Sequence, residues 1–223
     1  MLQAVIFDLD GTLLDTEPDF TLILNEQLMK HGRAAVSGAD VRKFVSAGAG
    51  AIVRQGFGLA EGDPQLQPLL TEFLDRYAEL IPVTQARLFD DIDWLIASLL
   101  EQGIAWGVMT NKHSRFSTPL LAKFENFATI GSLVCPDHVG ASKPDPKGIL
   151  LTCEQLGVEP TQAIYVGDHP RDIEAARNAG MPGIAVSWGY LPEAPALNAW
   201  GADYIADTPQ QLLQWCLQHA AGE

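Results

Sequence analysis

Short apolar runs and helical periodicities alternate along most of the chain. Residues 4–7 form an unbroken apolar run, the pattern of a strand that is buried on both faces of a parallel sheet. From residue 91 onward, helical and strand patterns follow one another, and Gly103 and Gly157 are placed as helix stops. This order predicts an α/β fold, a doubly wound (Rossmann-like) parallel sheet, with further strands at 104–110, 129–134, 163–166, 183–187 and 203–205.

Residues 16–81 show no strand pattern. Apolar residues recur there at helical spacing in three stretches, which cover about 20–28, 40–57 and 66–77. We therefore expect a small helical bundle, inserted after the first strand. The predicted domains are a core of residues 1–15 and 82–223 and a helical insert of residues 16–81.

Composition narrows the class of partner. The chain has 223 residues, 47% of them hydrophobic, which is typical of a globular protein with a full core. Its formal net charge of −14 argues against nucleic acid and anionic membrane as partners, because both need a basic face. The three scattered cysteines lack a metal-binding spacing, no apolar run spans a membrane, and no secretory signal is visible, so a cytoplasmic protein is expected.

Asp8 and Asp10 follow the first strand directly. Residues two apart on a strand point the same way, so these carboxylates are expected to lie close together where the strand ends. Like charges at short range are costly unless a cation lies between them, and oxygen ligands without cysteine or histidine favour Mg²⁺. The alternative for an Asp-x-Asp pair alone is an acidic turn that caps a buried strand.

Three later strand ends also carry polar groups, and ligands of open parallel sheets bind beyond such ends. Thr110-Asn111 could hold phosphate oxygens or cap the next helix, and Lys143 precedes a helix N-terminus. Asp168 and Asp172 add two carboxylates after Gly167. Each of these stretches alone is also compatible with an ordinary turn.

Taken together, these stretches resemble a known family. The string Phe-Asp-Leu-Asp-Gly-Thr-Leu-Leu-Asp-Thr at residues 7–16 resembles the nucleophile motif of the haloacid dehalogenase (HAD) superfamily of phosphotransferases. Thr-Asn, Lys-Pro and Gly-Asp-x3-Asp follow in the order of that superfamily's other three motifs.

The resemblance implies Mg²⁺-dependent hydrolysis of a phosphomonoester through an aspartyl-phosphate. Asp8 would be the nucleophile and Asp10 the general acid and base. Thr110, Asn111 and Lys143 would bind the phosphoryl group. The metal would be held by Asp8, the main-chain carbonyl of Asp10 and Asp168, with Asp172 as a ligand or a support.

The helical insert matches the position of a C1-type cap, which closes over the site in this superfamily. Its small-residue loop is uncharged, so contacts to substrate from Gly48 and Ala49 are expected to be main-chain. Arg54 could reach the site from one turn later, although an exposed arginine is the simpler interpretation. His169 could touch substrate or be a plain turn residue. Cys135-Pro136-Asp137-His138 is rejected as a metal site because its ligand count is poor.

Several further stretches, among them Trp188-Gly189-Tyr190, resemble the phosphoglycolate phosphatase-like branch. Within that branch they are most similar to bacterial N-acetylmuramic acid 6-phosphate phosphatases of cell-wall (peptidoglycan) recycling. The expected substrate is therefore a small-molecule phosphate ester, with the amino-sugar phosphate favoured over phosphoglycolate. A sugar phosphomutase and a catalytically idle phosphate-binding module remain as alternatives. A monomer or weak dimer is expected.

Overall fold

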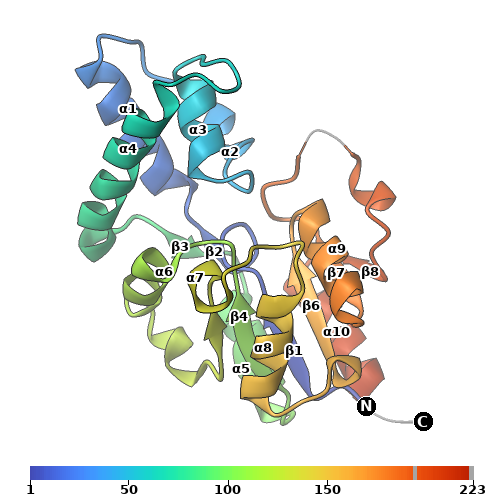
Figure 1. Cartoon of the computed structure of the whole chain (residues 1–223). Helices are drawn as coiled ribbons and strands as arrows, with labels where there is room; N and C mark the ends of the chain where they lie inside the picture. Colours follow the sequence, from blue (N-terminus) through green and yellow to red (C-terminus); the bar gives the residue numbers. More distant parts are fainter. Residues whose placement is uncertain (193–194, 221–223) are drawn as a thin grey trace.

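A single six-stranded sheet forms the centre of the molecule. The computed structural model describes residues 1–192 and 195–220. The strands lie in the order β5-β4-β1-β6-β7-β8, and every pairing in this sheet is parallel. The predicted doubly wound parallel sheet is therefore confirmed (Figure 1). Its strands are β1 (Ala4–Phe7), β4 (Ala105–Met109), β5 (Leu133–Val134), β6 (Ala163–Gly167), β7 (Gly183–Val186) and β8 (Tyr204–Ala206).

The first strand lies at the point where the strand order reverses. β1 pairs with β4 on one side and with β6 on the other, and Phe7 is in register with both Val108 and Val166. The residues after these three strands therefore emerge at the same edge of the sheet. Ligands of open α/β sheets bind at this reversal, so the fold itself places Asp8 where a site is expected.

The two faces of the sheet are covered by different helices. Val5 and Phe7 pack in a core with α5 (Ile92–Glu101) and α10 (Pro209–Ala220), whereas the alternate residues Ala4 and Ile6 pack in a second one. That second core includes residues of α8 (Lys147–Leu156) and α9 (Pro170–Ala179). Because both faces are buried, the strands read as continuous apolar runs.

Helices are the only regular secondary structure that the structure describes between residues 16 and 80. They are α1 (Glu17–Lys30), α2 (Gly38–Arg42), α3 (Ala49–Gly56) and α4 (Leu66–Leu80). Figure 1 shows them as a separate lobe beyond one end of the sheet. The ring of Phe20 on α1 lies 4.9 Å from that of Tyr77 on α4, and these apolar faces hold the lobe together.

A short antiparallel ribbon connects the lobe with the sheet domain. It consists of β2 (Leu14–Asp15) and β3 (Arg87–Leu88). The hydroxyl of Tyr190 accepts hydrogen bonds from the main-chain N–H groups of Thr16 and Glu17 and donates one to Asp15 Oδ1. The first of the two chain crossings is therefore tied to the core by the Tyr190 side chain as well as by the ribbon.

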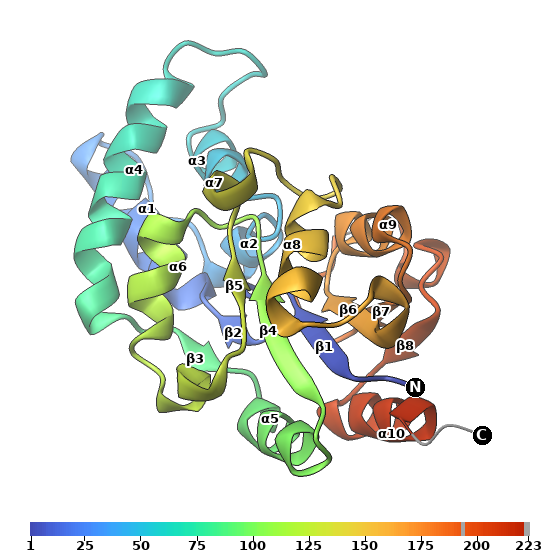
Figure 2. The ribbon, with the colours of Figure 1, turned by 60° about the horizontal axis from the view of Figure 1, so that its bottom comes forward.

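The remaining described elements are two further helices and four 3₁₀ turns. Figure 2 shows α6 and α7 near the lobe helices, on the side away from β8. Helix α6 ends at Leu121, and Phe124, with extended backbone, begins the next 3₁₀ turn. No helix in the described residues is long and apolar enough to cross a membrane. These elements are α6 (Ser114–Leu121), α7 (Pro136–Val139) and the 3₁₀ turns Ile81–Val83, Glu125–Thr129, Pro160–Gln162 and Leu197–Ala199.

Candidate active site

Asp8 and Lys143 form a buried ion pair directly after β1. Lys143 Nζ lies 2.8 Å from Asp8 Oδ1 and 2.8 Å from Asp172 Oδ1, and it donates to the hydroxyl of Tyr165. The Leu9 N–H donates to Asp8 Oδ1, which fixes the orientation of the carboxylate. Burial opposes the charge on Lys143, but the two carboxylates overcome this and raise its pKa.

Three carboxylates converge on this point. One oxygen from each of Asp8, Asp168 and Asp172 lies within 4.8 Å of the others. Burial, followed by repulsion from Asp172 and Asp8, raises the pKa of Asp168 to about 8. Burial also raises the pKa of Asp8, against the opposing effect of Lys143. Three carboxylates, two of them buried, have only Lys143 as a cationic partner, and it pairs with Asp8 and Asp172. Hard oxygen ligands with such a deficit of positive charge suit a divalent cation such as Mg²⁺.

Two glycines allow Asp168 to approach the first loop. A Cβ on Gly11 would clash with the Asp168 carboxylate, and Gly11 also has a positive φ of 88°. A Cβ on Gly189 would clash with Asp168 and with the carbonyl of Gly11. The Tyr190 N–H donates to Asp168 Oδ2 at 2.7 Å. The segment around Gly189 therefore contributes a main-chain donor to the carboxylate cluster.

Asp10 has partners of its own. Lys112 Nζ donates to both of its carboxylate oxygens, and the Thr16 hydroxyl donates to Oδ1 at 2.7 Å. The Lys112 ammonium lies over the rings of Phe20 and Tyr77 from the helical lobe. Asp10 is therefore held apart from the Asp8 cluster, by groups from both domains.

Thr110 and Asn111 end β4 beside the cluster. The Thr110 hydroxyl accepts from the Lys112 N–H, and Thr110 is almost fully buried. The Asn111 amide accepts from the main-chain N–H of Lys143 and donates to its carbonyl. The described contacts of Asn111 thus connect the ends of two strand loops and position Lys143.

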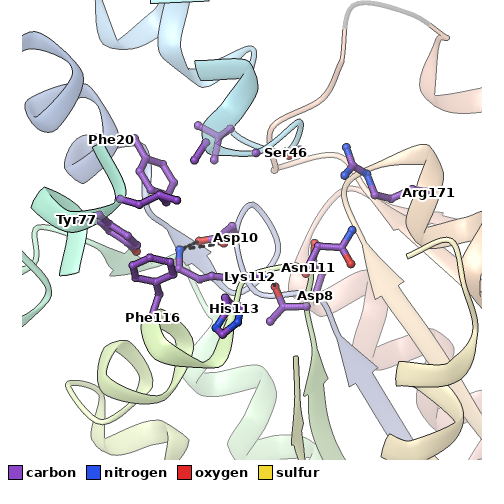
Figure 3. A pocket seen from close by; sticks show the side chains of 15 residues that line it. Asp8, Asp10, Phe20, Ser46, Tyr77, Asn111, Lys112, His113, Phe116 and Arg171 are labelled. Atoms are coloured by element: carbon purple, nitrogen blue, oxygen red, sulfur yellow. Dashed lines mark hydrogen bonds and ion pairs between the residues drawn. The ribbon is translucent and has the colours of Figure 1, made fainter. Parts of the chain in front are cut away.

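A cavity of about 260 Å³ opens above these groups, between the sheet domain and the lobe. Figure 3 shows Phe20, Tyr77 and Phe116 on one side of it, Arg171 on the other, and Asp8 and Asn111 below. The cavity is lined by Asp8, Asp10, Phe20, Val45, Ser46, Gly48, Ala49, Leu74, Tyr77, Thr110, Asn111, Lys112, His113, Phe116 and Arg171.

Four residues outside the core motifs were suggested as substrate contacts, and only two of them line the cavity. Gly48 and Ala49 line the cavity, as the expectation of main-chain contacts requires. Arg54 and His169 are not among the lining residues. His169 is the N-cap of α9 and accepts from Arg171, and burial lowers its pKa to about 4.

The structure brings Cys135, Asp137 and His138 together in α7, with one ligand atom from each within 4.8 Å of the others. Their polar atoms are engaged in local structure, however. The Cys135 N–H donates to His138 Nδ1, and the Asp137 carboxylate accepts from the main chain and hydroxyl of Ser114 at the start of α6. These contacts account for the cluster as two helix caps.

Sequence reasoning missed four residues of the site: Ser46, Lys112, Arg171 and Tyr190. Lys112 is adjacent to the Thr-Asn pair, so its position was a usable signal. Ser46 and Tyr190 reach Asp168 across 122 and 22 positions of chain, and no local pattern indicates such contacts.

The comparisons with known proteins identify the class. The sequence model of the haloacid dehalogenase-like hydrolase family matches residues 5–186. The chain belongs to this family, as the motifs predicted. It is a phosphatase within it, as the names of its relatives support.

Two relatives and one solved structure illustrate the similarity. The chain is 45% identical over 212 residues to the N-acetylmuramic acid 6-phosphate phosphatase of Pseudomonas aeruginosa, covering 95% of this chain and 93% of that one. It is 37% identical over 210 residues to the phosphoglycolate phosphatase of Xanthomonas campestris, covering 94% of each. A predicted phosphoglycolate phosphatase from Haemophilus somnus has the same fold, with a TM-score of 0.82 at 24% identity over 96% of this chain and 97% of that one.

Proposed function

We propose that the protein is a Mg²⁺-dependent phosphatase that hydrolyses N-acetylmuramic acid 6-phosphate through a phosphorylated Asp8. The observation that carries the chemistry is the cluster of the Asp8, Asp168 and Asp172 carboxylates, in which Lys143 pairs with Asp8 and Asp172 and Asp8 lines the cavity. The choice of substrate is supported by the relative that is 45% identical over nearly the whole chain.

In the proposed reaction, Asp8 attacks phosphorus while the bond from phosphorus to the sugar oxygen breaks. Asp10 supplies a proton to the departing alkoxide, and then accepts one from the water that attacks the aspartyl-phosphate. Water releases inorganic phosphate and regenerates the Asp8 carboxylate. Lys143 and Thr110 offset the charge of the phosphoryl oxygens during both transfers.

The carboxylates fit a magnesium ion, because they carry more negative charge than Lys143 neutralises. Asp8, Asp168 and the main-chain carbonyl of Asp10 would hold it, with Asp172 beside them. When bound, it supplies positive charge that offsets repulsion between the nucleophile and the anionic substrate. The overall charge of −14 makes such local compensation necessary.

The shape of the cavity favours a leaving group larger than a two-carbon acid. Phe20, Leu74, Tyr77 and Phe116 give it an apolar wall on one side. The less polar face of a sugar ring, or an acetamido methyl group, would bury against that wall.

Phosphoglycolate is the second candidate, because relatives that are 37% identical over 94% of the chain carry that name. Comparing kcat/KM for the two esters at saturating Mg²⁺ separates the candidates. We expect at least a tenfold preference for the amino-sugar phosphate, which corresponds to about 1.4 kcal/mol of differential transition-state binding. A tenfold preference for phosphoglycolate would overturn the substrate assignment and leave the roles of Asp8 and Asp10 intact.

A further inference from the structure

Arg171 brings into the cavity a positive charge that no described carboxylate neutralises. Two carboxylates line this space, and each has its own cation: Asp8 is paired with Lys143, and Asp10 with Lys112. Within residues 1–192 and 195–220, no carboxylate oxygen lies within 4.0 Å of the Arg171 guanidinium. A half-buried arginine that lines a cavity without a carboxylate partner is available to bind an anionic ligand.

The guanidinium is also held in place. Arg171 Nε donates to His169 Nδ1 at 3.0 Å, and the Arg171 main-chain N–H donates to the same atom at 3.2 Å. With Nδ1 as the acceptor, a neutral imidazole carries its proton on Nε2. The Arg171 Nη2 contact to Nε2 at 3.3 Å is then no hydrogen bond. The terminal N–H groups therefore have no acceptor among the described residues and remain available to a ligand.

This charge is distinct from the candidate phosphoryl site. Lys143 is buried and pairs with Asp8, whereas Arg171 is in the first turn of α9 and lies across the cavity from the aromatic wall (Figure 3). A substrate whose phosphoryl group lies at Asp8 therefore has apolar surface on one side and a guanidinium on the other. The uncharged loop around Gly48 and Ala49 offers no cation of its own for a second anionic group.

We propose that Arg171 determines specificity by binding the carboxylate of the substrate's leaving group. The inference rests on the proposed function in so far as the substrate carries such a carboxylate, as both candidate esters do. A planar guanidinium with its terminal N–H groups directed at the ligand matches a carboxylate in bidentate geometry, and lysine does not reproduce that match.

The test compares esters with and without the carboxylate. N-acetylglucosamine 6-phosphate lacks the lactyl acid of N-acetylmuramic acid 6-phosphate, and p-nitrophenyl phosphate is a second carboxylate-free reference. For Arg171→Gln we expect kcat/KM on the acidic sugar ester to fall by about tenfold to a hundredfold, mostly through KM. On both reference esters it should stay within about twofold of wild type. Arg171→Lys should recover only part of the loss.

Arg54→Gln is the matched control, because that arginine is on the lobe helix α3 and does not line the cavity. We expect it to leave kcat/KM unchanged on all three of these substrates. Equal losses for Arg171→Gln on acidic and neutral esters would overturn the proposal, because they would assign Arg171 to the phosphoryl group or to the fold. The proposal would also be overturned if Arg171→Gln kept the wild-type ratio of kcat/KM between the acidic and neutral esters.

A parallel pair of esters separates this inference from the choice of substrate. Phosphoglycolate and 2-hydroxyethyl phosphate differ mainly in the carboxylate. If wild type prefers phosphoglycolate over the amino-sugar phosphate, the substrate assignment fails. Arg171→Gln should even then lose activity selectively on phosphoglycolate. Suppose instead that wild type prefers the amino-sugar phosphate, but Arg171→Gln lowers kcat/KM equally on the acidic and neutral member of each pair. That result would contradict only the role of Arg171.

Discussion

Lys112 Nζ lies 2.9 Å from Asp10 Oδ1 and 3.1 Å from Asp10 Oδ2. The same ammonium is 4.9 Å from the ring centre of Phe20 and 4.7 Å from that of Tyr77. One buried lysine thus contacts both the proposed acid and base of the core and the aromatic face of the helical lobe. We propose that the lobe, residues 16–81, acts as a cap, and that this contact couples its position to Asp10.

Replacing Lys112 by Met tests that coupling. Asp10 would keep Thr16 as a partner but lose the cation that fixes both of its oxygens. We expect kcat on a sugar phosphate to fall by about tenfold to a hundredfold, with a smaller loss on p-nitrophenyl phosphate, whose leaving group needs little protonation. Lys147→Met, at an exposed lysine on α8, is the control. Equal losses on both esters would argue that Lys112 supports only the fold.

The carboxylate cluster predicts a pH dependence for the metal-free protein. The pKa of Asp168 is raised from an ordinary 3.8 to about 8 in the folded state, so its neutral form favours folding. That stabilisation is complete below pH 4 and is lost as pH rises toward 8. With EDTA present, we expect Tm to fall between pH 5 and pH 8 and the decrease to be smaller in Asp168→Asn.

Magnesium should reverse this dependence, because it binds the ionised carboxylates and stabilises the folded state. Thermal melts at pH 8 with and without Mg²⁺ measure the effect directly. A melting temperature that does not respond to Mg²⁺ in the wild type would contradict the assignment of the metal site. Asp145→Asn, which removes a half-buried carboxylate outside the cluster, should retain the full response.

Gly189 makes a steric prediction about the same carboxylate. A Cβ at this position would displace Asp168 or the Gly11 carbonyl. We expect Gly189→Ala to raise the Mg²⁺ concentration for half-maximal activity by about tenfold or more, equivalent to roughly 1.4 kcal/mol of lost binding. Gly50→Ala is the control, because a Cβ there meets only an ordinary contact at 3.9 Å. An unchanged Mg²⁺ requirement in Gly189→Ala would show that the cluster tolerates the displacement.

The Tyr190 hydroxyl allows a test of the first connection between the lobe and the core. Its hydroxyl accepts from the N–H groups of Thr16 and Glu17 and is almost fully buried. Tyr190→Phe leaves these donors without their partner, which costs about 1–3 kcal/mol of unfolding free energy. We expect a lower Tm and faster hydrogen exchange at residues 14–17. Tyr204→Phe, whose hydroxyl has no hydrogen bond in the described residues, should change neither quantity.

The sequence predicted those parts of the site that are dictated by strand ends. Asp8, Thr110 and Asp168 follow buried strands, and parallel pairing places them at one edge without further information. Asn111, expected at the phosphoryl group, lines the cavity, but its hydrogen bonds to the Lys143 main chain were not predicted. The contact between Asn111 and Lys143 depends on the relative height of two loops, which sequence periodicity does not encode.

Contacts between the lobe and the core were beyond prediction for a similar reason. Ser46 reaches Asp168 and Lys112 reaches Phe20 only because the lobe is placed over the carboxyl edge of the sheet. Arg171 follows His169 by two residues in a motif recognised for its aspartates. Its importance became visible only when the cavity showed that the other charged groups are paired.

The central claim is that a phosphoryl group is transferred from the substrate to Asp8. Intact-protein mass spectrometry of a rapidly quenched reaction tests this transfer most directly. Wild type should carry one transient phosphoryl group under turnover with Mg²⁺. Asp10→Asn should accumulate more of it, because Asp10 is proposed to activate the hydrolytic water. Asp8→Asn, nearly isosteric with the wild type, should show no phosphoryl adduct and no turnover. A phosphoryl adduct on Asp8→Asn, or a tenth of wild-type activity in that variant, would contradict the account.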